Sequence, residues 1–206
     1  GRLRVEGTGA SLVVANNTAL LQPAGQSLGG EGDAGEEVRC ADPRSPGTTA
    51  AAVLLHAGQM EVSGGGALRI EGNQCDGTSG CFVARALGKL MMVDAALSVV
   101  GNSQVSMAAG NCGGGMTIGP SGEAVLNRTS VSILDNKAVA NSGAGMCVVL
   151  ESTFACGSCS SFEVSGNAIS NPPCAPGGLC AGGGGLYVYK DSTFSAVAEV
   201  ADPMLT

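Results

Sequence analysis

Short runs in which apolar and polar residues alternate recur along much of the chain. An alternation with a period of two is typical of a β-strand that buries one of its faces. Four such runs begin with small residues and keep their apolar residues in the same phase. They are Gly65-Gly66-Ala67-Leu68-Arg69-Ile70, Gly113-Gly114-Gly115-Met116-Thr117-Ile118, Gly143-Ala144-Gly145-Met146-Cys147-Val148 and Gly183-Gly184-Gly185-Leu186-Tyr187-Val188. We therefore expect four equivalent strands, with Leu68, Met116, Met146 and Leu186 pointing inward.

Between these glycine boxes lies a second landmark, an alternating run that ends at asparagine. Its three copies are Leu97-Ser98-Val99-Val100-Gly101-Asn102, Val131-Ser132-Ile133-Leu134-Asp135-Asn136 and Phe162-Glu163-Val164-Ser165-Gly166-Asn167. Asparagine tolerates the left-handed backbone conformation that a sharp corner requires. We expect these asparagines to occupy one corner and their amides to hydrogen-bond along a column. The segments 3–5 and 11–17 are expected to be strands of earlier turns.

The expected strands are short, which determines how they can be stabilised. Strands of this length are not stable as isolated hairpins, and the chain lacks the Asn-Gly turns of a β-meander. Stacking one turn on the next, about 4.8 Å apart, pairs every strand and lines up the apolar residues in one narrow core. We therefore predict an all-β solenoid of parallel sheets. At roughly 22 residues per turn, it would have about nine turns and be near 40 Å long.

The spacing of the glycine boxes is irregular, which indicates loop insertions on a constant scaffold. We place these insertions at 75–89, 155–161 and 171–182, with a longer inserted loop at 22–49. The longer loop contains an acidic run, 31–37, which we interpret as a solvated segment, the alternative being a cation site. Residues 1–206 are expected to form a single domain. Because neither end has a polar cap over its strand edges, we expect this domain to be a fragment of a larger chain.

Nine cysteines are a high number for 206 residues, and six of them form close pairs in loops rich in Gly, Pro and Ser. The pairs are Cys75/Cys81, Cys156/Cys159 and Cys174/Cys180. We interpret them as disulfides, which are typical of an oxidising compartment. Two alternatives stay open: the last four cysteines resemble a widened zinc site, and Cys-Gly-Ser-Cys matches a redox motif. The odd cysteine is a free thiol, or it bonds to a partner or to an absent part of the chain.

Two N-glycosylation sequons, with Asn16 and Asn127 as acceptors, favour secretion. The net charge of −7 and the lack of a basic run with interleaved aromatics argue against a nucleic-acid partner. No apolar stretch reaches the roughly 18 residues of a membrane-spanning helix, so we expect no membrane insertion. We predict a secreted, extracellular protein at a cell surface, in a cell wall, an outer surface or a ciliary surface appendage.

The alternation of the two boxes resembles the repeat of the chlamydial polymorphic outer membrane protein family, in which Gly-Gly-Ala-(Ile/Leu/Val) alternates with Phe-x-x-Asn. Residues 65–68 match the first box letter for letter, whereas the other copies have Gly in place of Ala, and two have Met in place of the aliphatic residue. At the second box, Val99, Ile133 and Val164 stand where the family has Phe. The resemblance covers residues 64–195 and implies a right-handed parallel β-helix of the pectin-lyase-like class. Similar repeats occur in large eukaryotic surface proteins, which the sequons favour.

Parallel β-helices often bind or cleave polysaccharides, so an enzyme is a possibility that the sequence must be compared with. It has no Gly-x-Ser-x-Gly elbow, no phosphate-binding glycine motif and only one histidine, His56. Glycoside hydrolysis requires two carboxylates that face one bond. Glu151 and Asp191 stand at the same offset from their glycine boxes, and we interpret them as surface residues, the alternative being an acid pair or a calcium site. We expect no catalytic residues, no cofactor and no metal.

Tyr187 and Tyr189 lie two residues apart on one expected strand and therefore on the same outward face. Two rings on a flat sheet suit stacking on a sugar or packing against a protein partner, the alternative being cover by a loop of the same chain. We predict a non-catalytic structural or adhesive segment of a larger cell-surface or appendage glycoprotein. Its expected partners are other extracellular chains, further domains of the same chain, or glycans. The alternative function is a carbohydrate-active enzyme or a carbohydrate-binding module of the pectin-lyase-like type.

Overall fold

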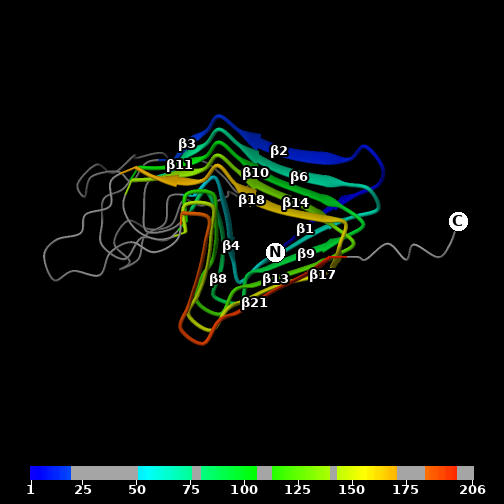
Figure 1. Cartoon of the computed structure of the whole chain (residues 1–206). Helices are drawn as coiled ribbons and strands as arrows, with labels where there is room; N and C mark the ends of the chain where they lie inside the picture. The colour runs from blue at the N-terminus through cyan, green and yellow to red at the C-terminus, as the bar shows by residue number, and fades with distance from the viewer. Residues whose placement is uncertain (20–50, 76–79, 106–112, 140–142, 171–183, 199–206) are drawn as a thin grey trace, which may run out of the picture.

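The computed structural model describes residues 1–19, 51–75, 80–105, 113–139, 143–170 and 184–198. Within these ranges the chain forms 21 β-strands and no helix, and every pairing between strands is parallel. The strands form four sheets, in which they run side by side (Figure 1). The predicted all-β arrangement of stacked parallel sheets is confirmed.

Each sheet takes every fourth strand of the chain. The first sheet contains β1 (Arg2–Glu6), β5 (Gln59–Ser63), β9 (Lys89–Val93), β13 (Glu123–Asn127), β17 (Thr153–Cys159) and β21 (Thr193–Ala198). The second sheet contains β2 (Ser11–Ala15), β6 (Ala67–Glu71), β10 (Ala96–Val100), β14 (Ser130–Leu134) and β18 (Ser161–Ser165). The third sheet contains β3 (Thr18–Ala19), β7 (Gln74–Cys75), β11 (Ser103–Gln104), β15 (Lys137–Ala138) and β19 (Ala168–Ile169). The fourth sheet contains β4 (Val53–His56), β8 (Phe82–Arg85), β12 (Met116–Ile118), β16 (Met146–Val149) and β20 (Leu186–Tyr189).

Consecutive strands therefore form repeat units that visit the four sheets in the same order. Repeat unit 1 is β1–β4, unit 2 is β5–β8, unit 3 is β9–β12, unit 4 is β13–β16 and unit 5 is β17–β20, after which β21 returns to the first sheet. Each unit pairs only with the unit before it and the unit after it. In Figure 1 the colours accordingly run from blue at one edge of the second sheet to yellow at its other edge.

Equivalent residues of successive units lie beside one another and form inward columns. One such column, in the second sheet, consists of Leu12, Leu68, Leu97, Val131 and Phe162. Columns from the other sheets meet this one in a single hydrophobic core. Leu68, Met116 and Met146 are fully buried, and Leu186 packs against the same core, as the alternation predicted.

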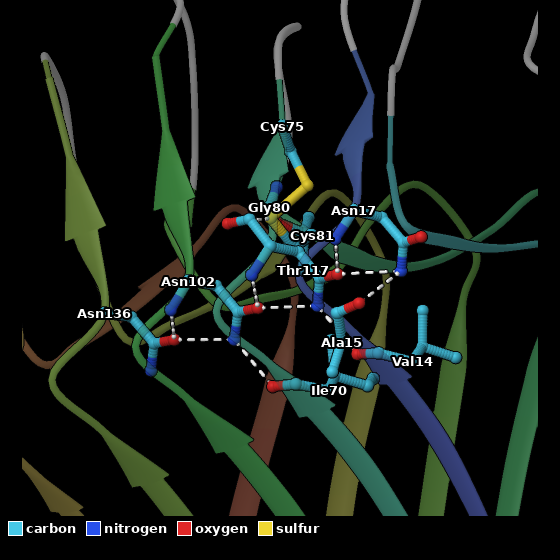
Figure 2. Close-up of a disulfide and its surroundings, with 11 residues drawn as sticks. Val14, Ala15, Asn17, Ile70, Cys75, Gly80, Cys81, Asn102, Thr117 and Asn136 are labelled. Atoms are coloured by element: carbon cyan, nitrogen blue, oxygen red, sulfur yellow. Dashed lines mark hydrogen bonds between the residues drawn. A yellow bond between two sulfur atoms is a disulfide. The ribbon is translucent and has the colours of Figure 1, made fainter.

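A ladder of asparagine side chains follows the second sheet at its corner with the third. Its members are Asn17, Asn73, Asn102, Asn136 and Asn167. At each step the backbone N–H and the Nδ2–H of one asparagine both donate to the Oδ1 of the next, at 2.9–3.1 Å. From Asn73 onward, Nδ2 also donates at 2.8 Å to a backbone carbonyl of the preceding unit. Figure 2 shows this line of amides, and the predicted column of hydrogen-bonded asparagines is confirmed.

The left-handed residue at this corner stands one position earlier than expected. Positive φ angles occur at the residue before each ladder asparagine, namely at Asn16, Gly72, Gly101, Asp135 and Gly166. The expectation that the ladder asparagines themselves adopt this conformation is wrong. The preceding residue turns the chain, and the asparagine is left with its amide directed along the stack.

The four glycine boxes are not equivalent, contrary to our expectation. Those at 113–118, 143–148 and 183–188 lead into strands of the fourth sheet, whereas the box at 65–70 leads into β6 of the second sheet. Residues 68–73 instead match the asparagine-terminated run, since Asn73 takes its place in the ladder. Alternation alone does not distinguish the sheets, because every strand with one buried face has the same period.

The units are longer and fewer than predicted. Strands of the first sheet begin at residues 2, 59, 89, 123, 153 and 193, so units begin 30 to 57 residues apart. The described residues thus form five units and one further strand, rather than about nine turns of roughly 22 residues. The difference arises because each unit contains four strands and one connection of variable length.

The predicted insertion at 155–161 is wrong, because all of these residues except Ser160 belong to β17 and β18. One extra residue in β17 forms a β-bulge against β21, between Cys156 and Cys159, with Ser158 at a φ of 52°. Within the predicted insertion at 75–89, residues 82–85 form β8, and 76–79 lie outside the described residues. The predicted loops at 22–49 and 171–182 also lie outside them.

We predict that a central ladder asparagine contributes more to stability than the first one. Asn102→Ala removes the acceptor of both Asn73 donors and the donor to the Ile70 carbonyl, all in the core. We expect it to lower the free energy of unfolding by about 3 kcal/mol, because buried polar groups lose their partners. Asn17→Ala, at an exposed position, should cost less than about 1 kcal/mol. Urea unfolding measures both values, and equal losses would contradict a ladder that stabilises the core.

We also predict that Gly145→Ala is poorly tolerated. A Cβ at this position would lie 2.6 Å from the carbonyl oxygen of Gly185 and 2.7 Å from Nδ2 of Asn167. Because the next unit and the ladder leave no space, we expect a loss of about 2 to 3 kcal/mol in the free energy of unfolding.

The matched control for Gly145→Ala is Gly101→Asn. A Cβ at Gly101 meets nothing within 4 Å, and units 1 and 4 already place Asn16 and Asp135 at the equivalent corner. This variant should change the free energy of unfolding by less than about 1 kcal/mol. If thermal and urea unfolding show that the two variants are equally stable, close approach between units does not explain the glycine boxes.

Candidate functional site

The large differences in length between units lie in one connection, which leads from the third sheet to the fourth. The five connections span 20–52, 76–81, 105–115, 139–145 and 170–185. In contrast, the third-sheet strand of every unit begins 14 to 16 positions after the start of the first-sheet strand of that unit. All five variable connections therefore leave the stacked sheets along one edge, which we call the loop edge.

Five of the nine cysteines belong to the connections of the loop edge. They are Cys40, Cys81, Cys112, Cys174 and Cys180. The loop edge therefore carries both the variation in connection length and more than half of the cysteines of the chain.

The structure joins two of the three short-range cysteine pairs that the sequence indicated. Cys75 bonds to Cys81 and Cys156 bonds to Cys159, with Cα atoms 5.5 and 5.7 Å apart. The first bond closes the connection between β7 and β8 at its base, beside the ladder (Figure 2), and the second spans the bulge in β17. All four cysteines are buried. Cys174 and Cys180 lie outside the described residues.

The bond between Cys156 and Cys159 argues against both the zinc site and the redox motif that the sequence left open. Zinc binds thiolates, and Cys156 and Cys159 carry no thiolate while their sulfurs are joined. The Cys-Gly-Ser-Cys segment lies inside a strand, whereas a redox Cys-x-x-Cys motif usually belongs to a βαβ unit. Both observations favour a structural disulfide at this position.

Cys147 forms a third disulfide, which the short spacings did not reveal. It is buried on the outward side of β16, and its sulfur is disulfide-bonded. Its partner lies outside the described residues, because the other four described cysteines bond to one another. The remaining cysteines all belong to connections of units 1, 3 and 5.

Tyr187 and Tyr189 lie on the outward side of β20, as alternation predicted. Their rings are nearly parallel, with 12° between the planes and 5.9 Å between the centroids. Tyr187 packs against Cys147 and Val149 of β16, whereas Tyr189 is 52% exposed. The structure thus brings both rings together, and Tyr189 offers most of the aromatic surface that a ligand could contact.

The outward side of the first sheet carries an apolar strip that the sequence analysis did not single out. It consists of Met91, Val93 and Val125, all more than a third exposed. Met91 and Val125 are direct neighbours in the paired strands β9 and β13. The sequence of β9 could have indicated this strip, because its outward residues Met91 and Val93 are as apolar as its inward residues.

Two ion pairs flank the apolar strip. Lys89 bonds to Glu123 at 2.6 Å, and the guanidinium of Arg128 donates two hydrogen bonds to Asp94, at 2.6 and 2.7 Å. The bonds from Arg128 hold the pKa of Asp94 below its usual value. Because all four side chains are exposed to solvent, these pairs contribute little to stability.

The two sequon asparagines lie in different surroundings. Asn16 is exposed at the corner after β2, and Asn127 is half-buried at the end of β13. The hydroxyl of Thr129, the third residue of the second sequon, is buried and donates to the carbonyl of Asn127 at 3.0 Å.

The carboxylates considered for catalysis lie at a turn. Glu151 and Asp191 occupy the same corner of adjacent units and are both exposed. His56 is exposed at the end of β4. In the described ranges, no three His, Cys, Asp or Glu side chains are grouped so that they could hold a metal ion. The same ranges contain no helix that is long and apolar enough to cross a membrane.

In comparisons with known proteins, no family model, no curated protein and no solved structure matches this chain. The stacked units, their surfaces and their cysteines are therefore the features from which a function can be inferred.

We predict that the five described cysteines do not react with alkylating reagents in the folded, oxidised chain. Their sulfurs are bonded and buried, so iodoacetamide without reductant should leave Cys75, Cys81, Cys147, Cys156 and Cys159 unmodified. After denaturation and reduction, the same reagent should label all five, as peptide mass spectrometry will show. Labelling of Cys156 and Cys159 before reduction would contradict the disulfide and restore the zinc and redox alternatives.

Proposed function

We propose that the repeat units are turns of a right-handed parallel β-helix of the pectin-lyase-like class. We further propose that the chain is a non-catalytic structural or adhesive segment of a larger extracellular glycoprotein at a cell surface or in a surface appendage. The observation that carries this proposal is the unbroken parallel stacking of five units with all variable connections at one edge.

The stacking supports a structural role because it makes a stiff body from short strands. Each unit is held by parallel pairing in four sheets, by one shared core and by the asparagine ladder. In such arrays each unit contacts only its neighbours, and the surface connections vary without disturbing the scaffold. A stiff body that presents variable loops along one edge suits adhesion to other extracellular chains, to further domains of the same protein, or to glycans.

The cysteines and sequons support an extracellular location. Disulfides form and persist in oxidising compartments, and the described residues contain five bonded cysteines. Glycosylation at Asn16 and Asn127 belongs to the same proposal. The resemblance of the two alternating boxes to the chlamydial polymorphic outer membrane protein repeat also favours a surface protein, and membership of that family is part of what we propose.

We predict that the chain is displayed at the cell surface with glycans at both sequons. Antibodies raised against it should label intact, non-permeabilised cells, and glycosidase treatment should reduce its mass. Asn16→Gln and Asn127→Gln should each remove one glycan, whereas Asn17→Gln keeps the first sequon and should leave the mass of the attached glycans unchanged. Labelling that requires permeabilisation, together with bare sequons, would contradict the proposal.

A carbohydrate-active enzyme or binding module is the second candidate, and the parallel rings of Tyr187 and Tyr189 favour it. Incubation with plant and microbial polysaccharides distinguishes the two functions. Release of reducing or unsaturated ends would establish an enzyme. Binding that Tyr189→Ala abolishes and Tyr189→Phe retains would establish a binding module, because both Tyr and Phe offer a ring for stacking.

A further inference from the structure

The second sequon lies directly beside the apolar strip of the first sheet. Asn127 is on the outward side of β13, two residues beyond Val125 and therefore on the same face of the strand. Its paired neighbour in β9 is Val93, which also belongs to the strip. Two of the three residues of the strip thus adjoin the side chain that would carry a glycan.

The side-chain amide of Asn127 is not used by the fold. The buried ladder asparagines donate through Nδ2 to neighbouring amides and carbonyls. Within the described part of the chain, Asn127 makes no side-chain hydrogen bond, although its backbone carbonyl accepts from the hydroxyl of Thr129 and from the N–H of Asp94. A sugar on Nδ2 would therefore break no hydrogen bond among these residues.

The residues that border the strip differ on its two sides. In unit 5, the small residues Ala155 and Gly157 stand next to Val125 and Asn127. A Cβ atom at Gly157 would meet only Oδ1 of Asn127, at 3.9 Å, so this side is open. In unit 2, the polar residue Glu61 stands next to Met91. The apolar surface is therefore confined to the neighbourhood of the sequon, and a sugar ring has room to lie on it.

The first sequon has different surroundings and provides a comparison. Asn16 is exposed at the corner after β2, and the equivalent corner residues of the next two units are Gly72 and Gly101. Since glycine has no side chain, these two units offer no apolar side chain to a glycan on Asn16.

We propose that the first sugar of a glycan on Asn127 packs on Val93 and Val125, so that the glycan covers the apolar strip and stabilises units 3 and 4. This inference rests on the proposed function, which places a glycan on Asn127. One face of an N-acetylglucosamine ring consists of C–H groups. Contact between this face and the valine methyl groups removes apolar area from water, which favours the folded state.

The burial of Thr129 determines when the glycan is attached. The sequon is recognised through its third residue, and the Thr129 side chain is fully buried in the folded chain. Transfer joins Nδ2 of Asn127 to C1 of the first sugar of a lipid-linked oligosaccharide, while the lipid diphosphate leaves and Nδ2 loses one proton. This step therefore precedes the stacking of unit 4, and the sugar is already present when the strip forms.

The test compares the two sequons in the 206-residue chain secreted from eukaryotic cells, with peptide mass spectrometry to establish which asparagines carry glycans. Asn127→Gln should lower the melting temperature by about 3 °C or more, and Asn16→Gln by less than about 1 °C. In protein made without glycosylation, both variants should melt within about 1 °C of wild type, which separates the glycan from the side-chain change. An endoglycosidase that leaves only the first sugar should preserve the melting temperature of wild type.

A second pair of variants tests whether the strip is the surface that the sugar contacts. The stabilisation by the Asn127 glycan is the difference in melting temperature between Asn16→Gln protein made with and without glycosylation. Adding Val125→Ser should reduce this difference by about half or more, because the apolar contact is lost. The matched control is Val13→Ser, which changes an outward valine of the second sheet that is 54% exposed, and it should leave the difference unchanged.

Each outcome separates this inference from the proposed function. A glycan on Asn127 that does not raise the melting temperature, or that raises it equally in Val125→Ser, would overturn the inference and leave the proposed function standing. A bare Asn127 would overturn the inference together with the proposed glycosylation at this sequon, whereas labelling of intact cells tests the surface location independently.

Discussion

The parallel register between successive units is the constraint on which the rest of the structure depends, and the asparagine ladder enforces it. Each buried amide accepts two bonds from one neighbouring unit and donates to the next asparagine and to a backbone carbonyl. A shift of one residue would leave these groups unpaired in the core, at a cost of several kcal/mol in each unit. It would also turn every inward aliphatic residue outward. Polar and apolar interactions therefore select the same arrangement.

The light composition of the chain follows from the closeness of the units. Gly145 lies against the carbonyl of the next unit and against a ladder amide, and Gly115 is placed in the same way against Asn136. Side chains at these corners would separate the units and break the ladder. The 34 glycines therefore include positions where packing between units leaves no space for a Cβ atom. Phe82 lies in the core of unit 2, whereas the other three phenylalanines, Phe154, Phe162 and Phe194, meet in unit 5 and β21 of the stack.

Alternation and the asparagine landmark were sufficient to predict parallel stacking, the inward direction of Met116 and Met146, and the hydrogen-bonded amides. They were not sufficient to assign strands to sheets, because Leu68 and Met116 have the same local pattern although they lie in different sheets. The sequence predicts a loop at Cys156–Cys159, because Gly157 and Ser158 are typical turn residues. In the structure, pairing with β13 on one side and β21 on the other keeps this segment in a continuous strand. The Cys147 bond was missed because sequence spacing reports only local cysteine pairs.

The stacked register also provides a physical argument about catalysis. Equivalent residues of adjacent units lie side by side, so a catalytic cluster on a sheet would appear as reactive residues in neighbouring positions of a column. Among the described strands, the outward acidic residues of the first sheet are followed or preceded by basic, polar or apolar ones; Glu123, for example, stands next to Lys89 and Thr153. The acidic neighbours Glu151 and Asp191 lie at a turn and are exposed to water. General acid catalysis by a carboxyl group requires a raised pKa, which usually comes from burial or from a second carboxylate held close in a dry site. At this turn neither carboxylate is enclosed in a dry site, and the proposed structural or adhesive role does not depend on their reactivity.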